Sequence, residues 1–319
     1  MPSIGTLHHL RPPEASSFAV HRDLQQTSTV RIDSGVREGD TISPFYDPMI
    51  AKLIVWGWDR DAALKQMGNA LRHYQVAGVA TNIDFLARLV GSAAFTTAQL
   101  DTGLIEKNHA VLFPAESAPP SHVIALAVAA LLHAEQSTDY TDPWAASDGW
   151  RMNHPVQRVL LFSAASQSCE VQVTYRQQGW SLQSSDAQAD ISAIRINGRD
   201  ITLRFGDRSV HGTVARVDQR LTIFCDGRHH VLDWIDPLAH AGSTEVASGQ
   251  LTAPMPGKII AVLVEAGSHV ERGAPLLIME AMKMEHTITA PHAGVVAQVL
   301  YRVGDQVTDG VALLVFATE

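Results

Sequence analysis

The C-terminal part of the chain contains an internal repeat. The segment APMPGKIIAVLVEAGSHVERGAPLLI, which starts at Ala253, aligns without a gap with APHAGVVAQVLYRVGDQVTDGVALLV, which starts at Ala290. The offset is 37 residues, so that Gly257 meets Gly294. Each half alternates apolar strand-like runs with glycine turns, and repeated units bury their apolar faces against each other. The repeat therefore predicts a small all-β domain over residues 251–319, with two halves related by a pseudo-twofold axis.

A lysine between two methionines lies at the junction of these halves, in the sequence Ala281-Met282-Lys283-Met284. In a pseudo-symmetric β domain this junction is the hairpin that joins the halves, so we expect Lys283 to be displayed rather than buried. The methionine side chains are flexible and can pack along the hairpin. A displayed lysine amine can be joined to a carboxyl group in an amide, which removes its charge.

Two linkers divide the 319 residues into three parts. The segments 114–121 (PAESAPPS) and 239–250 (AHAGSTEVASGQ) are rich in small, polar, Pro and Gly residues. They separate 1–113, 121–238 and 251–319, and two or three domains are expected for this length. A hydrophobic content of 46% with 18% charged residues indicates a folded chain rather than a disordered one.

Composition and charge exclude several classes of function. The net charge is −9 and no run of Lys and Arg stands out, which argues against a nucleic-acid or membrane-surface role. The N-terminus does not have the pattern of a signal peptide, and the most apolar run, 123–132, is too short to span a bilayer. Cys169 and Cys225 form no CxxC pair, so neither a zinc knuckle nor a disulfide scaffold is expected. We expect a reducing compartment: the cytoplasm, or the mitochondrial matrix in a eukaryote.

The first part mixes strands and helices. Strands are expected at 30–33 and 50–56. A helix with acidic residues in its first turn follows, and a second helix, capped by Thr81 or Asn82, runs to about Val90. This α+β material opens abruptly, which suggests that the front of a domain lies upstream.

The middle part begins with the segment HVIALAVAALLHAEQ, which is predicted to form a helix with apolar residues on every face. We therefore expect this helix to be buried on all sides. Asn197-Gly198 and Asp226-Gly227 are hairpin signals. We expect an antiparallel barrel, or a strongly curved sheet, with the helix against or inside it. The expected strands are 156–162, 170–175, 191–196, 201–205, 210–217, 221–224 and 231–234.

The third part resembles the biotinyl domain of biotin-dependent carboxylases, because PMPG at 254–257 precedes AMKM and a second half-repeat ends near the C-terminus. The resemblance implies a flattened β-barrel (hammerhead) fold and Lys283 as the biotin-bearing lysine. It makes Ala281, Met282 and Met284 the biotinylation motif and a biotin protein ligase a partner. The lipoyl domain shares the repeat, but its lysine usually follows an aspartate, so Met282 favours biotin.

The first part resembles the C-terminal end of a biotin carboxylase domain over about residues 1–110, on the segments PSIGTL, VRIDSGVREGDTISPFYDPMIAKLIVWG and TNIDFL. The resemblance implies that the ATP-grasp region, which would bind ATP and Mg²⁺, is absent here, so that the chain alone would be inactive. Arg31 falls on the family's arginine that stabilises the biotin enolate and holds bicarbonate. A guanidinium is always charged and forked toward oxyanions, although a surface ion pair is the alternative for Arg31.

The middle part resembles the BT region that docks acyl-CoA carboxylase alpha subunits on the carboxyltransferase beta subunit. The segment DPWAASDGWRMN, 142–153, is more similar to methylcrotonyl-type chains. The resemblance implies a ligase in which Lys283 carries carboxybiotin between the carboxylase and carboxyltransferase sites. Geranyl-CoA and propionyl-CoA carboxylase alpha subunits remain alternatives. So does a non-catalytic biotinylated carrier with a degenerate carboxylase remnant.

Other catalytic or metal sites are not expected. The adjacent pairs His8-His9 and His229-His230 would point to opposite faces of a strand, which makes a shared metal awkward. The chain contains no HExxH and no GxSxG. We therefore expect no metal held by side chains, and both cysteines in the core.

Overall fold

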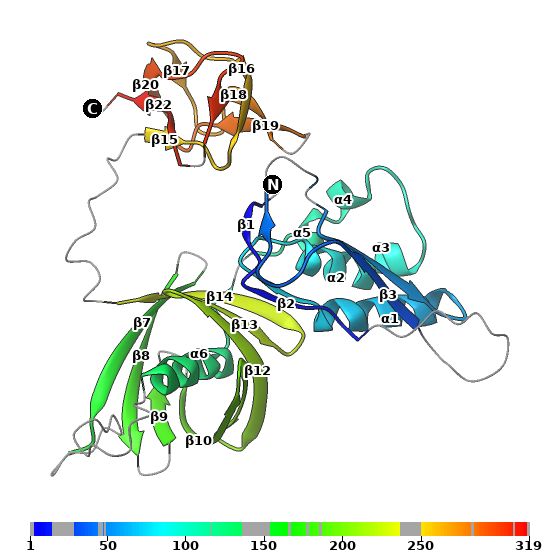
Figure 1. Ribbon diagram of the computed structural model, residues 1–319, viewed down its shortest axis with the longest axis vertical. Coiled ribbons are helices and arrows are strands. Elements are labelled where there is room, and N and C mark those ends of the chain that lie inside the picture. The colour runs from blue at the N-terminus through cyan, green and yellow to red at the C-terminus, as the bar shows by residue number, and fades with distance from the viewer. Residues whose placement is uncertain are drawn as a thin grey trace.

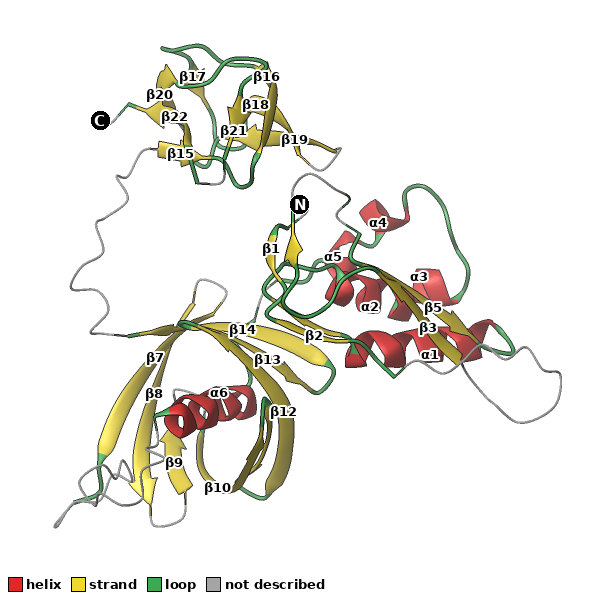
Figure 2. Cartoon of the chain, viewed as in Figure 1, coloured by secondary structure: helices red, strands yellow, loops and turns green. Residues whose placement is uncertain are grey.

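The computed structural model of the chain forms three folded units, shown in Figure 1 and coloured by secondary structure in Figure 2. No helix among the described residues is long and apolar enough to cross a membrane. The expected boundaries between the units stay predictions, because 237–249 lies outside the described residues. The structure describes residues 3–14, 29–43, 47, 49–115, 117–135, 154–164, 167–176, 179–184, 187–236, 250–281, 284–308 and 310–317.

The first unit is an α+β assembly of three two-stranded sheets, with strand pairs β1-β4, β2-β6 and β3-β5, and five helices. Its strands are β1 (Gly5–Thr6), β2 (His9–Arg11), β3 (Thr29–Ser34), β4 (Thr41–Ile42), β5 (Ala51–Trp56) and β6 (Gln75–Ala77). Its helices are α1 (Arg60–His73), α2 (Ile83–Gly91), α3 (Ala93–Thr96), α4 (Leu104–Lys107) and α5 (His109–Leu112).

The two long helices of this unit lie where periodicity predicts them. Asp59 caps α1, because its side chain accepts a hydrogen bond from the backbone N–H of Ala62 at 2.8 Å. The expected cap of α2 is wrong in part: Asn82 occupies the N-cap position but makes no capping bond. Its backbone, with φ −97° and ψ 13°, is not the extended conformation from which a cap side chain usually reaches the first turn.

The second unit is a closed antiparallel barrel in the order β10-β11-β12-β13-β14-β7-β8-β9. Seven of these strands were predicted, and the eighth, β9, was missed because its five residues begin at a glycine and contain no β-branched side chain. The strands are β7 (Gln157–Ala164), β8 (Gln167–Arg176), β9 (Gly179–Gln183), β10 (Gln188–Asn197), β11 (Asp200–Phe205), β12 (Arg208–Val217), β13 (Arg220–Cys225) and β14 (Arg228–Ile235).

The apolar helix α6 (Ser121–Ala134) lies inside this barrel (Figure 1). Its residues from Val123 to Ala129 are all buried, which decides between the two expected positions of the helix. A Cβ placed on Gly212 would lie 2.5 Å from Cδ1 of Leu126, so the helix packs closely on β12. The barrel wall and the helix thus share one apolar core.

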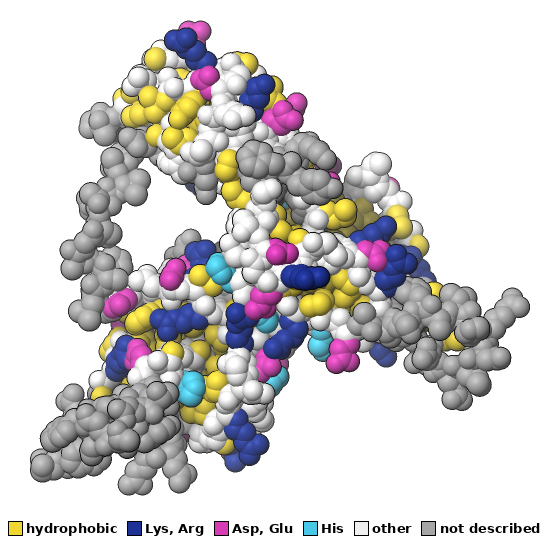
Figure 3. Space-filling model, viewed as in Figure 1, with side chains coloured by type: hydrophobic (Ala, Val, Ile, Leu, Met, Phe, Trp, Pro, Cys, Tyr) yellow, Lys and Arg dark blue, Asp and Glu magenta, His cyan; other side chains and the backbone are white. Residues whose placement is uncertain are grey.

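A polar network joins the first unit to the barrel. The guanidinium of Arg11 donates two hydrogen bonds to the carboxylate of Asp200, at 2.8 and 3.1 Å. Arg199 donates to Glu38 at 2.7 Å and lies 3.0 Å from Nδ1 of His9, which is buried. Side chains nearly 200 positions apart in sequence therefore meet in this network, and Lys and Arg side chains gather where the two units adjoin (Figure 3).

An apolar contact accompanies this network. Ala77 of β6 packs with Ala215 and Phe224 of the barrel in a small buried cluster. The His9 ring lies 5.6 Å from the Phe224 ring. Because His9 is buried and His8 is exposed, adjacent histidines do point to different sides here, as the strand periodicity predicts.

The third unit consists of two four-stranded sheets, in the orders β15-β22-β20-β17 and β19-β18-β16-β21. At an offset of 37 residues, each strand of one sheet corresponds to the strand at the same place in the other. The strands are β15 (Gln250–Thr252), β16 (Gly257–Val262), β17 (His269–Val270), β18 (Pro275–Ala281), β19 (Met284–Thr289), β20 (Gly294–Val299), β21 (Gln306–Val307) and β22 (Ala312–Phe316).

Backbone hydrogen bonds repeat with the same offset. Leu263 N–H donates to the Leu276 carbonyl, and Leu300 N–H donates to the Leu313 carbonyl, both at 2.9 Å. The predicted pseudo-twofold relation between the two halves is therefore confirmed at the level of strand order and of individual bonds.

Candidate functional site

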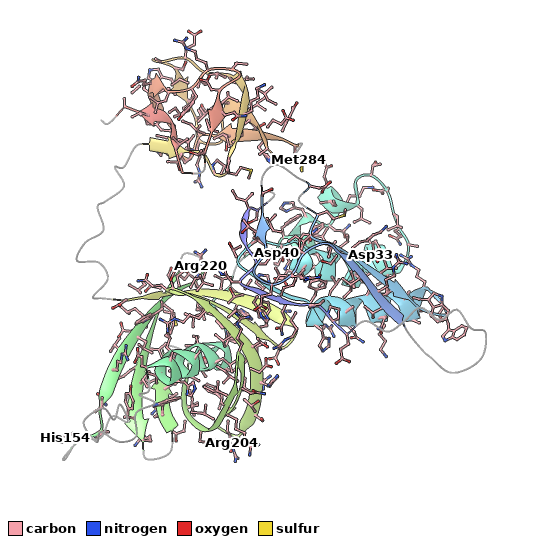
Figure 4. All side chains as sticks on the ribbon, viewed as in Figure 1. Asp33, Asp40, His154, Arg204, Arg220 and Met284 are labelled. Carbon is pink, nitrogen blue, oxygen red and sulfur yellow. The ribbon has the colours of Figure 1, made fainter. Side chains whose placement is uncertain are left out.

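The strands β18 and β19 form an antiparallel hairpin that ends at the AMKM motif. Ala281 pairs with Met284, the last pair of the ladder. Ala281 is buried, whereas Met284 exposes 47% of its surface, and Figure 4 shows Met284 at one end of the third unit. Met282 and Lys283 lie outside the described residues, so the expectation that Lys283 is displayed stays a prediction.

One face of the hairpin is packed into the core of the third unit. Met279, Ala281 and Ile288 are buried there, while Glu280 and Glu285 pair across the strands on the exposed face. This period of two is the pattern expected of a half-buried antiparallel sheet. The hairpin is thus a rigid base with an acidic outer surface.

The PMPG segment packs against this hairpin. Met255 is buried in the same core, and Gly257 begins β16, which pairs with β18. A Cβ on Gly257 would lie 2.6 Å from the Glu280 carbonyl oxygen and 2.7 Å from Cε of Met279. Only glycine allows β16 to approach the hairpin this closely, which gives a packing reason for the last residue of PMPG.

His286 is the residue of this site that sequence reasoning missed. It follows Met284 by two positions on β19 and is only 7% exposed. Its Nε2 is buried without a hydrogen-bond partner, and burial lowers the pKa of the imidazole. The alternation of residues along the strand MEHTIT, 284–289, places position 286 on the same face as the apolar Ile288, and this signal could have identified the histidine.

Arg31 lies on β3, far from the hairpin in sequence and in a different unit. Its guanidinium makes a two-pronged ion pair with Asp33, at 2.7 and 2.9 Å, and both groups are exposed. The pKa of Asp33 is lowered, chiefly by the hydrogen bonds from Arg31. Arg31 therefore forms the surface ion pair that the sequence left open as the alternative. The catalytic role of Arg31 stays a prediction.

A second polar cluster lies where α6 begins beside the turn between β13 and β14. His122, Cys225 and Asp226 place their ligand atoms within 4.8 Å of one another. Asp226 already accepts hydrogen bonds from Arg208 at 3.0 Å and from His122 at 3.1 Å. Burial raises the pKa of the Cys225 thiol to about 11, which disfavours the thiolate that binds metals. The expectation of no metal site stays a prediction.

Three family models match the chain in succession. Residues 1–107 match the biotin carboxylase C-terminal domain, 119–237 match the BT domain of the methylcrotonyl-CoA carboxylase alpha subunit, and 249–316 match the domain of biotin-requiring enzymes. The chain combines a biotin carboxylase C-terminal domain, a BT domain and a biotinyl domain. The resemblances inferred from the sequence are confirmed for all three parts, and the third match supports covalent biotin as the cofactor.

Curated relatives align with most of this chain. The chain is 33% identical over 308 residues to the mitochondrial methylcrotonoyl-CoA carboxylase subunit alpha of Dictyostelium discoideum. It is 33% identical over 307 residues to the mouse protein of that name, and 28% identical over 314 residues to a propionyl-CoA carboxylase alpha chain of Ruegeria pomeroyi. Each alignment covers 90% of this chain but only 42%, 41% and 45% of the relative, so the chain spans less than half of their length.

Two solved structures of carboxylases align with this chain at low TM-scores. A single-chain, multi-domain long-chain acyl-CoA carboxylase aligns over all of this chain and 19% of its own, at 21% identity and a TM-score of 0.30. The biotin carboxylase domain of a Hydrogenobacter thermophilus 2-oxoglutarate carboxylase aligns over 36% of this chain and 23% of its own, at 30% identity and a TM-score of 0.31.

Proposed function

We propose that this chain is the biotin carrier and subunit-docking portion of an acyl-CoA carboxylase alpha subunit, with biotin attached to Lys283. The observation that carries the proposal is the place of AMKM in a domain that matches biotin-requiring enzymes. Ala281 and Met284 close the β18–β19 ladder, and the two residues that join them include the lysine.

The residues around the motif fit this role. Biotin, when bound, carries a carboxyl group between two active sites. Lys283 breaks no bond in that transfer, because its Nζ only holds the group through an amide. The packed hairpin base fixes the attachment point, and tethering makes each encounter intramolecular. Glu280 and Glu285 would present an acidic face to the ligase and to the two active sites.

The attachment is tested by the intact mass of the full chain expressed with a biotin protein ligase, followed by peptide mapping. We expect a gain of one biotin amide on Lys283, which the Lys283→Arg variant loses. Lys258→Arg is the matched control, because Lys258 is an exposed lysine of the same domain, on β16. An unmodified Lys283 would remove the proposed function, and a lipoyl mass would replace biotin with lipoate.

We propose 3-methylcrotonyl-CoA as the acyl-CoA of the complete enzyme and a carboxyltransferase beta subunit as the docking partner. The BT match and the names of several relatives support this choice. Propionyl-CoA stays the alternative, since alpha chains of that type also align. The segment 142–153, on which the sequence comparison relied, lies outside the described residues.

Partner choice is tested by binding the biotinylated chain to purified beta subunits of the methylcrotonyl and propionyl types. We expect the methylcrotonyl type to bind more tightly. The reverse order would reassign the substrate. Geranyl-type beta subunits belong in the same series, because they were the other alternative left open by the sequence.

ATP and Mg²⁺ would act in an ATP-grasp region supplied in addition to these three domains. We therefore expect no biotin- and bicarbonate-dependent ATP hydrolysis by this chain alone, and such activity would overturn the assignment. For its location we propose the cytoplasm, or the mitochondrial matrix in a eukaryote, since the eukaryotic relatives are named as mitochondrial proteins.

The proposal competes with a non-catalytic carrier whose carboxylase-type domain is a degenerate remnant. The ion pairs and the apolar cluster between that domain and the barrel favour a folded, functional domain. Limited proteolysis separates the two, because a remnant would be cut rapidly within residues 1–113 while the barrel stayed intact.

A further inference from the structure

A large cleft lies between the carboxylase-type domain and the barrel. Its volume is about 2040 Å³, and it is lined by α1, α2 and residues 11–14 and 113–115 on one side and by β12 to β14 on the other. Because both domains contribute to its walls, the cleft exists only while they are paired. Interdomain clefts of this kind are common ligand sites in proteins.

The cleft is cationic although the whole chain is acidic. Its lining includes five Lys and Arg side chains, one of which, Arg11, is paired with Asp200 outside the lining, against four acidic side chains, whereas the net charge of the chain is −9 with neutral histidines. Two of the acids are already engaged: Asp84 pairs with His229 at 3.1 Å, and Asp226 accepts from Arg208 and His122. The lining is therefore left with an excess of positive charge.

Two arginines from different domains line this cleft beside the turn between β13 and β14. The stem of Arg72, in the last turn of α1, packs against Gly227, since a Cβ there would lie 2.8 Å from Cγ of Arg72. Arg228 follows Gly227 in the chain and lines the same cleft. Among the described residues, neither guanidinium has a hydrogen bond or an ion pair, and both are exposed.

The half-buried histidine beside this turn is neutral and adds no charge to the two arginines. This histidine, His230, has its pKa lowered by burial first and then by the neighbouring charges of His229 and Arg228. Arg72 lies in the last turn of α1, where the helix dipole favours a positive charge. This dipole does not account for Arg228, which comes from the other domain and lies beside a second histidine.

Apolar side chains lie in the same cleft. Phe224 and Val231 of the barrel and Phe113 of the carboxylase-type domain belong to its lining, and Val231 and Phe113 are exposed. A few convergent charged groups beside apolar and aromatic surface are typical of sites for small organic anions. A metal cation fits less well, because Arg208 already pairs with the carboxylate of Asp226 and the raised pKa of Cys225 disfavours its thiolate.

We propose that this cleft binds a small organic phosphate, with its phosphate groups held by Arg72 and Arg228 and its apolar part against the exposed Val231. Guanidinium forks suit phosphate oxygens, and charge-assisted hydrogen bonds to them are the strong ones. The ligand would bridge the carboxylase-type domain and the BT barrel and stabilise their pairing, since it binds only the paired state. This site is separate from the biotin-bearing hairpin and does not depend on the function proposed for it.

The test is a calorimetric titration of the full chain with ADP, coenzyme A and inorganic pyrophosphate, without divalent cations and at low salt. We expect one-site binding of at least one organic phosphate, weakened about tenfold by Arg72→Gln and by Arg228→Gln. Tighter binding of ADP would indicate a nucleotide ligand, and tighter binding of coenzyme A would indicate a coenzyme ligand. Equally tight binding of pyrophosphate would show that the phosphate groups alone suffice. Arg195→Gln is the matched control, because Arg195 is an exposed barrel arginine outside the cleft.

Several results would overturn the proposal. They are no binding of any probe, binding that neither cleft variant weakens, or equal weakening by Arg195→Gln, which would indicate unspecific attraction. Stoichiometric binding of Zn²⁺ alone that Cys225→Ser abolishes would make the turn a metal site instead. Circular dichroism checks that each variant is folded. Because Arg72 and Arg228 are both exposed, each substitution tests the proposal independently.

Discussion

Gly257 and Gly294 occupy equivalent positions of the repeat, but their neighbours differ. A Cβ on Gly257 meets backbone and a buried methionine at under 3 Å, whereas one on Gly294 meets the ring of Phe316 at 3.3 Å and the ring of His292 at 3.6 Å. We predict that Gly257→Ala destabilises the biotinyl domain by about 1–3 kcal/mol through overpacking. Gly294→Ala should change the stability by less than about 1 kcal/mol, because reduced freedom of the unfolded chain offsets a small clash.

Hydrogen exchange of peptides from β16 and β18 in the full chain measures this difference. The comparison holds the type of substitution and the position in the repeat constant, so only the local neighbours vary. Equal effects of the two variants would mean that close packing of PMPG on the hairpin does not explain its glycine.

His286 predicts a pH dependence of the same domain. Burial lowers its folded-state pKa below the ordinary value of 6.5, so the folded domain keeps the ring neutral while the unfolded chain takes up a proton. The stability associated with His286 is fully present above pH 6.5 and declines as the pH falls from 6.5 toward the folded-state pKa. We therefore expect β18 and β19 to lose protection against hydrogen exchange between pH 7.5 and pH 5.5, after correction for the intrinsic rates.

The variant His286→Gln isolates this effect, because glutamine stays neutral throughout that range. Its absolute stability will differ from that of the natural chain, but its pH slope should be flat. A slope unchanged by the substitution would assign the pH dependence to other groups.

At the scale of elements, the helix α6 is the centre of the barrel core. Leu126 is fully buried, and its Cδ1 faces Gly212 across the interface with β12. We predict that Leu126→Ala lowers the free energy of unfolding of the barrel by about 2–5 kcal/mol. Val159→Ala removes two methyl groups from a half-exposed position on β7 and should cost no more than about 0.5 kcal/mol. Urea unfolding followed by exchange of β11 to β13 peptides tests the pair, and similar midpoints would contradict the central role of α6.

Elements with a strong period were predictable from the sequence, and those without one were not. The uniform apolarity of α6 indicated a helix buried on all sides, and the glycine pattern of the repeat indicated two matching sheets. The strand β9 was missed because only Trp180 and Leu182 mark its apolar alternation. The cap at Asn82 failed because a suitable residue type does not ensure the extended backbone that capping needs.

The candidate site was predictable to the same degree. AMKM and the repeat located the hairpin, because both depend on local spacing. The unpartnered Nε2 of His286 and the contacts of Gly257 depend on side chains from other strands, which a spacing pattern does not identify. The pairing of Arg31 with Asp33 was accessible, since residues two apart on a strand share a face.

At the scale of the whole molecule, the carboxylase-type domain and the barrel are joined by interactions that no periodic sequence pattern predicts. The fork of Arg11 on Asp200 links positions in different domains, and Thr213 adds a hydrogen bond to the same carboxylate at 2.7 Å. These contacts lower the pKa of Asp200, with the Arg11 hydrogen bonds as the largest cause. The carboxylate is thus charged and paired at neutral pH.

We predict that Asp200→Asn loosens this pairing of domains by about 1 kcal/mol, a value kept small because both partners are partly exposed. Hydrogen exchange should accelerate in β2 and β6, which adjoin the barrel, and the radius of gyration from small-angle scattering should rise. The matched control is Asp233→Asn, which removes an equivalent fork with Arg220, at 2.8 and 3.1 Å, inside the barrel sheet. If the control accelerates β2 and β6 as much as Asp200→Asn does, the loss of a carboxylate from the barrel, and not the interdomain fork, governs the pairing.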